Sequence, residues 1–274
     1  MPDMTNTDKI FKAKKIGLFD SGIGGFSVLG NLLKLMPEAS FYYVSDDAHA
    51  PYGPKTDEFI TERSIHIAAE LIDQGVELIV VACNTATAAS IDLLREKFKD
   101  TPFVGVEPYL KAYYSMPEGH HQKMMVLTTE STGKSERFKR LKERLDPDSQ
   151  IDHYSLKNLA RLIEDYFYHS EDKIDFDKKI EAELDFLKSH NYAYAILGCT
   201  HYPLVKNKIE EFLNLKAISP CAHVAQRVVD LSFLKDEDRG SGIEKENFFN
   251  FLSTTNNLWI KKNRESLYGP FKGI

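Results

Sequence analysis

Short apolar runs alternate along the chain with longer stretches in which apolar residues recur at helical spacing. The apolar runs are predicted as buried strands, and they occupy residues 14–20, 41–46, 76–83, 102–106, 123–129 and 192–199. The amphipathic stretches are predicted as helices, and they occupy residues 27–38, 56–75, 134–145 and 176–190. Strands that are apolar on both faces and alternate with helices are typical of a parallel α/β sheet covered on both sides.

Within this pattern, two motifs occur twice and in the same order. KIGLFDSGIGGFSVL begins at Lys15, and a similar strand-to-helix turn, KMMVLTTESTGKSERF, begins at Lys123. GVELIVVACNTATAAS is likewise matched by NYAYAILGCTHYPLV, so that Cys83 and Cys199 stand at corresponding positions. The repeat predicts two similar, doubly wound, parallel-sheet α/β domains. Because ligands of such sheets bind outside the carboxyl ends of the strands, we expect the functional site in the cleft between the domains.

The repeat also predicts the extent of each domain. The first domain is expected to comprise residues 14–101 and 214–274, and the second, inserted domain residues 102–213. Residues 1–13 are mostly polar and are expected to form a flexible N-terminal extension rather than a signal peptide.

Composition and charge narrow the class of protein. Of the 274 residues, 42% are hydrophobic and 28% are charged, which is ordinary for a globular protein. The net charge of −6 argues against nucleic acid or an anionic membrane as a partner. No apolar run approaches the roughly 18 residues of a membrane span, so we expect a cytoplasmic protein. Three widely spaced cysteines without a C-x-x-C pattern argue against a disulfide framework or a metal site.

The two matched cysteines are the first candidates for chemistry. A single cysteine at a strand end is most often a buried apolar side chain. Here hydrogen-bonding residues follow both at once, because Asn-Thr follows Cys83 and Thr-His follows Cys199. Two thiols on opposite sides of one cleft favour a catalytic interpretation. Cys221 has no counterpart of this kind, and we interpret it as structural.

Four segments together resemble the glutamate racemases of the cofactor-independent aspartate/glutamate racemase family. They are IGLFDSGIGGFSVL, APYGPKT, VVACNTATAAS and LGCTHYPL, which begin at residues 16, 50, 80 and 197. VGVEP and the spacing of Thr129, Thr132 and Ser135 support the resemblance more weakly. It implies a homodimeric, cofactor-independent and metal-free isomerase that interconverts L- and D-glutamate. D-glutamate would supply peptidoglycan synthesis, and with it cell-wall biogenesis and cell shape.

The resemblance also implies roles for individual residues. One acid/base group on each face of the substrate can remove the Cα proton from one side and return a proton to the other. By resemblance these groups are Cys83 and Cys199, assisted by Asp20 and His201 respectively. The residues expected to hold the amino and carboxylate groups of the substrate are Asp20, Ser21, Tyr52, Gly53, Asn84, Thr85, Thr200 and His201.

Simpler interpretations exist for several of these residues, and parts of the sequence depart from the family. Asp20 or Ser21 could cap the following helix, and Pro-Tyr-Gly could be an ordinary turn that makes Tyr52 a packing residue. Where the family has Gly-Asp-Thr before that turn, this chain has SDDAHAPYG, and the family's Asp-Ser appears here as ISPC. The acidic residue of the family's second half has no clear counterpart, and Glu164 is only a loose candidate.

Three other functions remain open on sequence. GIGGFS after a strand, with Asp46 and Asp47 at the end of the next strand, could bind a nucleotide, although Ser27 replaces the third glycine of that fingerprint. A catalytically silent binding protein on the same fold would use both cysteines only for packing. A racemase of aspartate or of a related amino acid would share the two-thiol chemistry.

Overall fold

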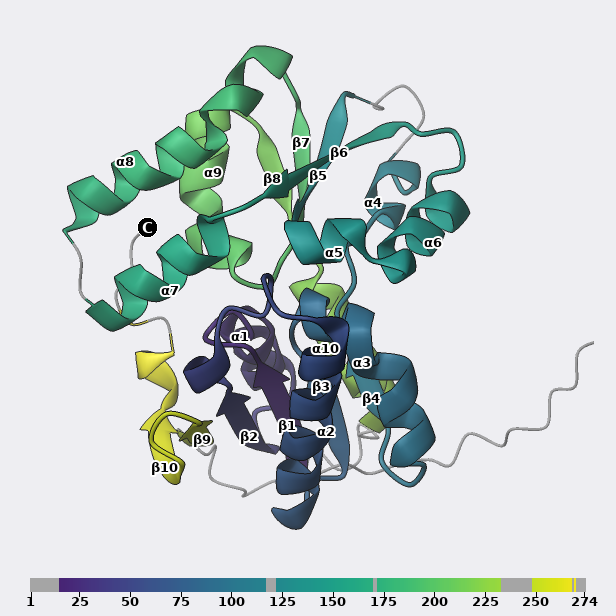
Figure 1. Cartoon of the computed structure of the whole chain (residues 1–274), viewed down its shortest axis with the longest axis vertical. Helices are drawn as coiled ribbons and strands as arrows, with labels where there is room; N and C mark the ends of the chain where they lie inside the picture. The colour runs from purple at the N-terminus through teal and green to yellow at the C-terminus, as the bar shows by residue number, and fades with distance from the viewer. Residues whose placement is uncertain (1–14, 117–121, 170–171, 233–247, 268, 270–274) are drawn as a thin grey trace, which may run out of the picture.

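The computed structural model describes residues 15–116, 122–169, 172–232, 248–267 and 269. The predicted N-terminal extension, residues 1–13, lies outside them. The chain forms two sheets, one above the other in Figure 1, and helices cover both. No helix within the described ranges combines the length and the apolar character needed to cross a membrane.

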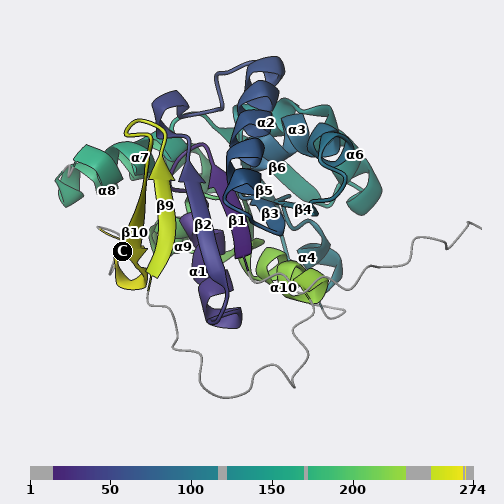
Figure 2. The same ribbon diagram turned by 90° about the horizontal axis from the view of Figure 1, so that it is seen from below.

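The first sheet has six strands in the order β10-β9-β2-β1-β3-β4. Its strands are β1 (Lys15–Asp20), β2 (Ser40–Ser45), β3 (Leu78–Val81), β4 (Phe103–Gly105), β9 (Phe248–Ser253) and β10 (Leu258–Asn263). All neighbours are parallel except β9 and β10, which form an antiparallel pair at the edge. The helical segments of this half are α1 (Phe26–Leu35), η1 (Asp47–His49), α2 (Asp57–Asp73), α3 (Asn84–Lys97), α10 (Cys221–Ser232) and η5 (Arg264–Ser266). In Figure 2, α2 and α3 cover one face of the sheet, and α1 and α10 the other.

The second sheet has four parallel strands in the order β6-β5-β7-β8. The strands are β5 (Met124–Thr129), β6 (Ile151–Leu156), β7 (Tyr194–Gly198) and β8 (Lys216–Ile218). The helices are α4 (Lys111–Tyr114), α5 (Glu130–Lys134), α6 (Glu136–Leu145), α7 (Leu159–His169), α8 (Lys173–Leu184) and α9 (Lys206–Leu213). Two short 3₁₀ segments complete this half, η2 (Asp185–His190) and η3 (Tyr202–Val205).

The two sheets share one topology. The order β2-β1-β3-β4 in the first corresponds to β6-β5-β7-β8 in the second, so β1 matches β5 and β3 matches β7. These are the pairs that the repeated motifs predicted, and the prediction of two similar α/β halves is confirmed. Sheet membership adds a detail to the predicted division. The strand β4 lies in the first sheet although it follows residue 101, and β8 lies in the second although it follows residue 213.

The apolar runs are buried on both faces, as predicted. In β1, Leu18 packs in one buried cluster and the next residue, Phe19, in another, and neither is exposed. All four residues of β3 are fully buried. Because side chains of a strand alternate between its faces, a strand covered on both sides must be apolar throughout. This requirement made the central strands recognisable in the sequence.

Strand β9, which precedes the edge strand β10 near the C-terminus, completes the core of the first half. Phe249 is 1% exposed, and its ring lies 6.2 Å from that of Phe26 in α1. We predict that Phe249→Ala lowers the free energy of unfolding by about 3–5 kcal/mol, since a buried ring is lost and a cavity remains. Phe248→Ala is the matched control, because the neighbouring Phe248 is 47% exposed. Urea denaturation checks both, and equal effects would contradict the assignment of β9 to the core.

Candidate active site

Cys83 and Cys199 occupy equivalent places just beyond strands β3 and β7. Cys83 precedes α3 and caps it, with its Sγ accepting a hydrogen bond from the N–H of Ala86 at 3.4 Å. Cys199 directly follows Gly198, the last residue of β7. Both side chains are free thiols and only 5% exposed. The topology therefore brings one thiol from each half to the ends of the central strands.

A hydrogen bond between a carboxylate and a hydroxyl joins the two halves at these strand ends. Asp20, the last residue of β1, is fully buried, and its Oδ2 accepts a hydrogen bond from Thr200 Oγ1 at 2.8 Å. Its Oδ1 accepts one from the N–H of Gly22 at 2.8 Å. Thr200 comes from the second half, directly after Cys199. The predicted residues Asp20 and Thr200 are thus in direct contact across the two domains.

His201 lies between Cys199 and a carboxylate of α7. Its Nδ1 is 3.8 Å from Cys199 Sγ, and its Nε2 is 2.5 Å from Glu164 Oε1. The same Glu164 oxygen accepts the N–H of Ile23 at 2.8 Å, so this side chain also bridges the two halves. Glu164 therefore fixes the orientation of the imidazole that faces the Cys199 sulfur.

Burial and charge together set the protonation of this cluster. Burial lowers the pKa of His201, but its hydrogen bonds to Cys199 and Glu164 and the negative charges of Glu164 and Asp20 raise it well above its usual value. The ring is therefore an imidazolium at neutral pH, and its Nδ1–H can donate to the Cys199 sulfur. Asp20 has a raised pKa, because burial outweighs the opposing effect of the nearby His201 charge.

Cys83 has a different electrostatic environment. Burial is the largest cause that raises the pKa of its thiol, and the negative charge of Asp20 raises it further. The N–H groups of Ala86 and Ser21 act in the opposite direction by donating to the sulfur. A negative charge on Cys199 would raise the pKa of Cys83 as well. Cys83 therefore rests as a thiol.

The glycines of the SGIGG segment permit this close approach. A methyl group at Gly22 would overlap the carboxylate of Glu164, and one at Gly24 would overlap the ring of His201. The glycine-rich turn after β1 thus makes room for two side chains of the second half. It has this explanation without a bound phosphate, which removes the main reason for the nucleotide-binding interpretation.

Several short polar side chains follow the cysteines and Asp20 in the sequence, and one of them contacts hydroxyl groups of the other half. Asn84 is 4% exposed, and its Oδ1 has no hydrogen-bond partner among the described residues. Thr85 Oγ1 lies 3.2 Å from the hydroxyl of Thr129 and 3.2 Å from that of Thr132, both in the second half. Ser21 is buried beside Asp20, with its hydroxyl 3.4 Å from the carboxylate. These short side chains offer several donors and acceptors in little space.

In the Pro-Tyr-Gly turn, the phenol of Tyr52 has a partner within the protein, whereas two main-chain N–H groups have none among the residues that the structure describes. Tyr52 is 1% exposed, and its hydroxyl donates to Asp46 Oδ2 at 2.6 Å. Within the described part of the chain, the N–H groups of Tyr52 and Gly53 donate no hydrogen bond. Two unpaired N–H groups in sequence are suited to receive a carboxylate. The tyrosine ring is thus a packing residue, while the backbone of the turn remains available.

Asp20, Glu164 and His201 also have ligand atoms within 4.8 Å of one another, a spacing that a metal ion could bridge. Their hydrogen bonds account for the arrangement without one. The Nε2 of His201 is bonded directly to Glu164, and both oxygens of Asp20 accept protein hydrogen bonds.

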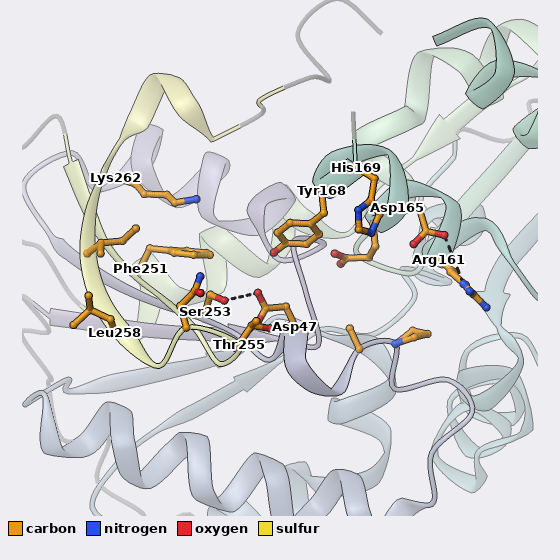
Figure 3. A pocket seen from close by; sticks show the side chains of 15 residues that line it. Asp47, Arg161, Asp165, Tyr168, His169, Phe251, Ser253, Thr255, Leu258 and Lys262 are labelled. Atoms are coloured by element: carbon orange, nitrogen blue, oxygen red, sulfur yellow. Dashed lines mark hydrogen bonds and ion pairs between the residues drawn. The ribbon is translucent and has the colours of Figure 1, made fainter. Parts of the chain in front are cut away.

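A cavity of about 1150 Å³ adjoins the Glu164 side of the site. Its walls are α7, the β9–β10 hairpin and the segment 47–51 (Figure 3). On its floor, Ser253 donates to Asp47 at 2.5 Å and ties the hairpin to the end of β2. Glu164 and Pro51 line the cavity, whereas Cys83 and Cys199 do not. The cavity therefore reaches Glu164 but not the two thiols.

Comparison with known proteins agrees with this geometry. A family model described as Asp/Glu/hydantoin racemase matches residues 31–228. The chain belongs to the Asp/Glu/hydantoin racemase family. A glutamate racemase of Lachnospira eligens is 38% identical over 193 residues, which are 70% of this chain and 71% of the relative. Glutamate racemase 2 of Bacillus subtilis is 34% identical over 239 residues, 86% of this chain and 88% of the relative.

Among solved structures, this chain is similar to the Escherichia coli glutamate racemase, which was crystallised with L-glutamate and the activator UDP-MurNAc-Ala. The TM-score is 0.74 at 29% identity, over 87% of this chain and 88% of the other. Two α/β halves that meet at the ends of their strands are thus the fold of this racemase family.

Sequence reasoning missed part of the site. Glu164 was only a loose candidate, although it holds His201 and reaches across to Ile23. Thr129 and Thr132 were used to support the resemblance but were not named as site residues, although both lie against Thr85. Their spacing, Thr-x-x-Thr beginning at the last residue of β5, was the available signal. For Glu164 the only signal was an acidic residue within the amphipathic stretch that forms α7.

We predict that Glu164→Gln lowers the pKa of His201, because burial then acts against the charged ring without the carboxylate that offsets it. NMR of the imidazole nitrogens over a pH series measures this directly. His201 is expected to lose its charge at lower pH in the variant than in the parent. Glu181→Gln is the control, since Glu181 pairs with Lys208 at the surface. If His201 titrates in Glu164→Gln as it does in the parent, Glu164 does not set the charge of the His201 ring.

Proposed function

We propose that this protein is a glutamate racemase that interconverts L- and D-glutamate without a cofactor. The observation that carries the proposal is the pair of thiols at equivalent strand ends of two similar halves. Each thiol has its own polar neighbours, and the pair lies among short hydrogen-bonding side chains. The glutamate racemases named above, at 34–38% identity over 70% or more of this chain, support the same substrate.

The proposed reaction removes the Cα proton of the bound amino acid with one sulfur and returns a proton from the other. Cys199 acts on L-glutamate, and Cys83 acts on D-glutamate. Only a thiolate can act as the base, so each sulfur must be deprotonated when its enantiomer binds. On the Cys199 side, the imidazolium of His201 supplies a positive charge and a donor beside the sulfur.

The Cys83 side requires a contribution from the substrate. Burial and Asp20 keep Cys83 protonated in the free protein. The ammonium group of an amino acid bound near Asp20 would offset that negative charge and make a thiolate at Cys83 easier to form. In the free protein, Cys83 is a thiol and Cys199 has the positively charged His201 beside it. The free protein is thus arranged to accept L-glutamate first.

The remaining groups hold the substrate. Asn84, Thr85, Thr200 and the main chain of Ser21, Tyr52 and Gly53 provide donors and acceptors for its amino and carboxylate groups. The protein acts in the cytoplasm as a homodimer, and its D-glutamate supplies peptidoglycan synthesis and so supports cell shape. Its two domains comprise approximately the predicted residues, with β4 assigned to the first and β8 to the second.

Optical activity tests the function directly. Purified protein without added cofactor is expected to racemise either enantiomer of glutamate to an equal mixture. Aspartate is one methylene shorter, which is worth only about 1–3 kcal/mol in a pocket, so hydrogen bonds to the distal carboxylate must add to the selectivity. We expect faster turnover of glutamate than of aspartate. Equal or faster turnover of aspartate would favour an aspartate racemase. If neither amino acid is turned over, that result would favour a catalytically silent binding protein.

Single cysteine variants test the two-sided mechanism. We predict that Cys83→Ser and Cys199→Ser each slow racemisation by about 10²–10⁴-fold, the usual contribution of a general acid or base. The remaining cysteine can still remove and return a proton on its own face. In deuterated water, Cys83→Ser should therefore exchange the Cα proton of L-glutamate, and Cys199→Ser that of D-glutamate, without inversion.

Cys221→Ser is the control for these variants. Cys221 is buried, and its thiol donates to Ser27 at 3.2 Å rather than to a residue proposed to contact the substrate. NMR follows the loss of the Cα proton signal, and chiral chromatography follows inversion. Near-normal racemisation by either single variant, or loss of racemisation in Cys221→Ser, would contradict the assignment.

A further inference from the structure

A buried carboxylate lies directly behind the Tyr52–Gly53 turn. Asp46 follows β2 and is fully buried, yet its pKa is lowered, because hydrogen bonds from Arg63, Tyr52 and His49 outweigh the effect of burial. Arg63 in α2 donates to both carboxylate oxygens, from Nη2 at 2.7 Å and from Nε at 3.1 Å. His49 Nδ1 lies 3.0 Å from Oδ1. The carboxylate is therefore charged and held by several donors at once.

The phenol of Tyr52 is the group that connects the turn to this carboxylate. It donates to Asp46 Oδ2 at 2.6 Å, and its ring packs in the same buried cluster as Cys83. The main chain of Asp46 is fixed as well, because its N–H donates to the carbonyl of Asp20 at 3.0 Å. One residue thus connects the end of β1, helix α2 and the turn whose N–H groups are unpaired.

We propose that Asp46 and Arg63 are positioning residues, which hold the Tyr52–Gly53 turn in the conformation that receives the substrate carboxylate. The inference rests on the proposed function, since it names how one part of that site is kept in place. A turn without an anchor would lose conformational entropy each time it bound substrate. A turn fixed through the Tyr52 phenol has lost that entropy on folding, so binding is tighter.

The neighbouring acid shows that this role is specific to Asp46. Asp47 accepts hydrogen bonds from Ser253 at 2.5 Å and from the N–H of Thr255 at 3.0 Å, so it holds the β9–β10 hairpin. Both acids of the SDD segment therefore have defined structural partners. Of the two side chains, only that of Asp46 is bonded to the Tyr52–Gly53 turn.

Tyr52→Phe and Asp46→Asn test the proposal. The second half offers a pair with the same kind of bond, because the buried Asp146 accepts a hydrogen bond from Tyr114 Oη at 2.8 Å, and none of the proposed site residues bonds to it. Tyr114 itself is 44% exposed. Tyr114→Phe and Asp146→Asn therefore control for the general effect of losing such a bond. Two measurements are made on all four variants: steady-state kinetics with L- and D-glutamate, and hydrogen–deuterium exchange of residues 50–56 without substrate.

Tyr52→Phe and Asp46→Asn are expected to raise KM about tenfold and to leave kcat within about twofold, since the turn that the lost bond anchors holds the substrate equally before and during the reaction. Exchange in the turn should become faster in both. The control variants should change neither quantity. Arg63→Lys keeps the charge but not the two-pronged donor, so its KM should lie between those of the parent and Arg63→Gln.

Unchanged exchange and unchanged KM in Tyr52→Phe and Asp46→Asn would overturn the proposal, and so would a fall in kcat at constant KM. If the parent protein does not turn over glutamate, the proposed function fails, and the exchange measurement alone then decides whether Asp46 anchors the turn. Faster exchange in the two variants, with the controls unchanged, would support the anchor even in that case.

Discussion

A buried imidazolium beside two buried carboxylates is the constraint on which the rest of the active site depends. Charges inside a protein are costly unless other charges and hydrogen bonds compensate them. His201 has Glu164 at 2.5 Å, and the Asp20 charge also raises its pKa. These three residues come from the loop after β7, from α7 and from the end of β1. His201 and Glu164 belong to the second half and Asp20 to the first, so Asp20 can add its charge to the cluster only where the two halves meet. The glycines at 22 and 24 follow from the same requirement, because any larger residue would separate the charges.

Much of the fold could be predicted, because the central strands must be apolar on both faces. β1, β3, β5 and β7 satisfy this requirement, and the repeated motifs paired them correctly. The strands that sequence analysis missed lie mostly where the requirement is relaxed. β6 is an edge strand whose central residues, Asp152 to Ser155, are exposed or half-buried, and β8 has only three residues. β10 is also an edge strand and is largely exposed, so nothing in its sequence had to be continuously apolar. Its antiparallel pairing with β9 is the exception to the parallel sheets that were predicted.

The candidate site was predictable where chemistry requires a particular residue type close to a strand end. Cys83 and Cys199 stood out in this way, whereas Asp20 and His201 were named from the resemblance to the racemase family. Glu164 could not be found in this way, because it is 37 residues from its partner and lies on an amphipathic helix, where an acidic residue usually faces water. Tyr52 shows the opposite difficulty. Its position in the turn was predicted, but the direction of its phenol depends on Asp46 and Arg63, which sequence patterns do not connect to it.

The two thiols have unequal surroundings, although racemisation has two equivalent directions. Cys199 faces a positively charged ring, while Cys83 faces the negative charge of Asp20. The enantiomers have equal free energies in water, so the equilibrium constant of the proposed reaction is one. The ratio kcat/KM must then be the same for L- and D-glutamate under the same conditions, whatever the site looks like. Unequal surroundings can therefore alter kcat and KM only together and in proportion. The cysteine whose thiolate is less stable in the free protein must regain that free energy from contacts with its bound enantiomer. The kcat for that enantiomer then differs from the kcat for the other by the same factor as the KM does.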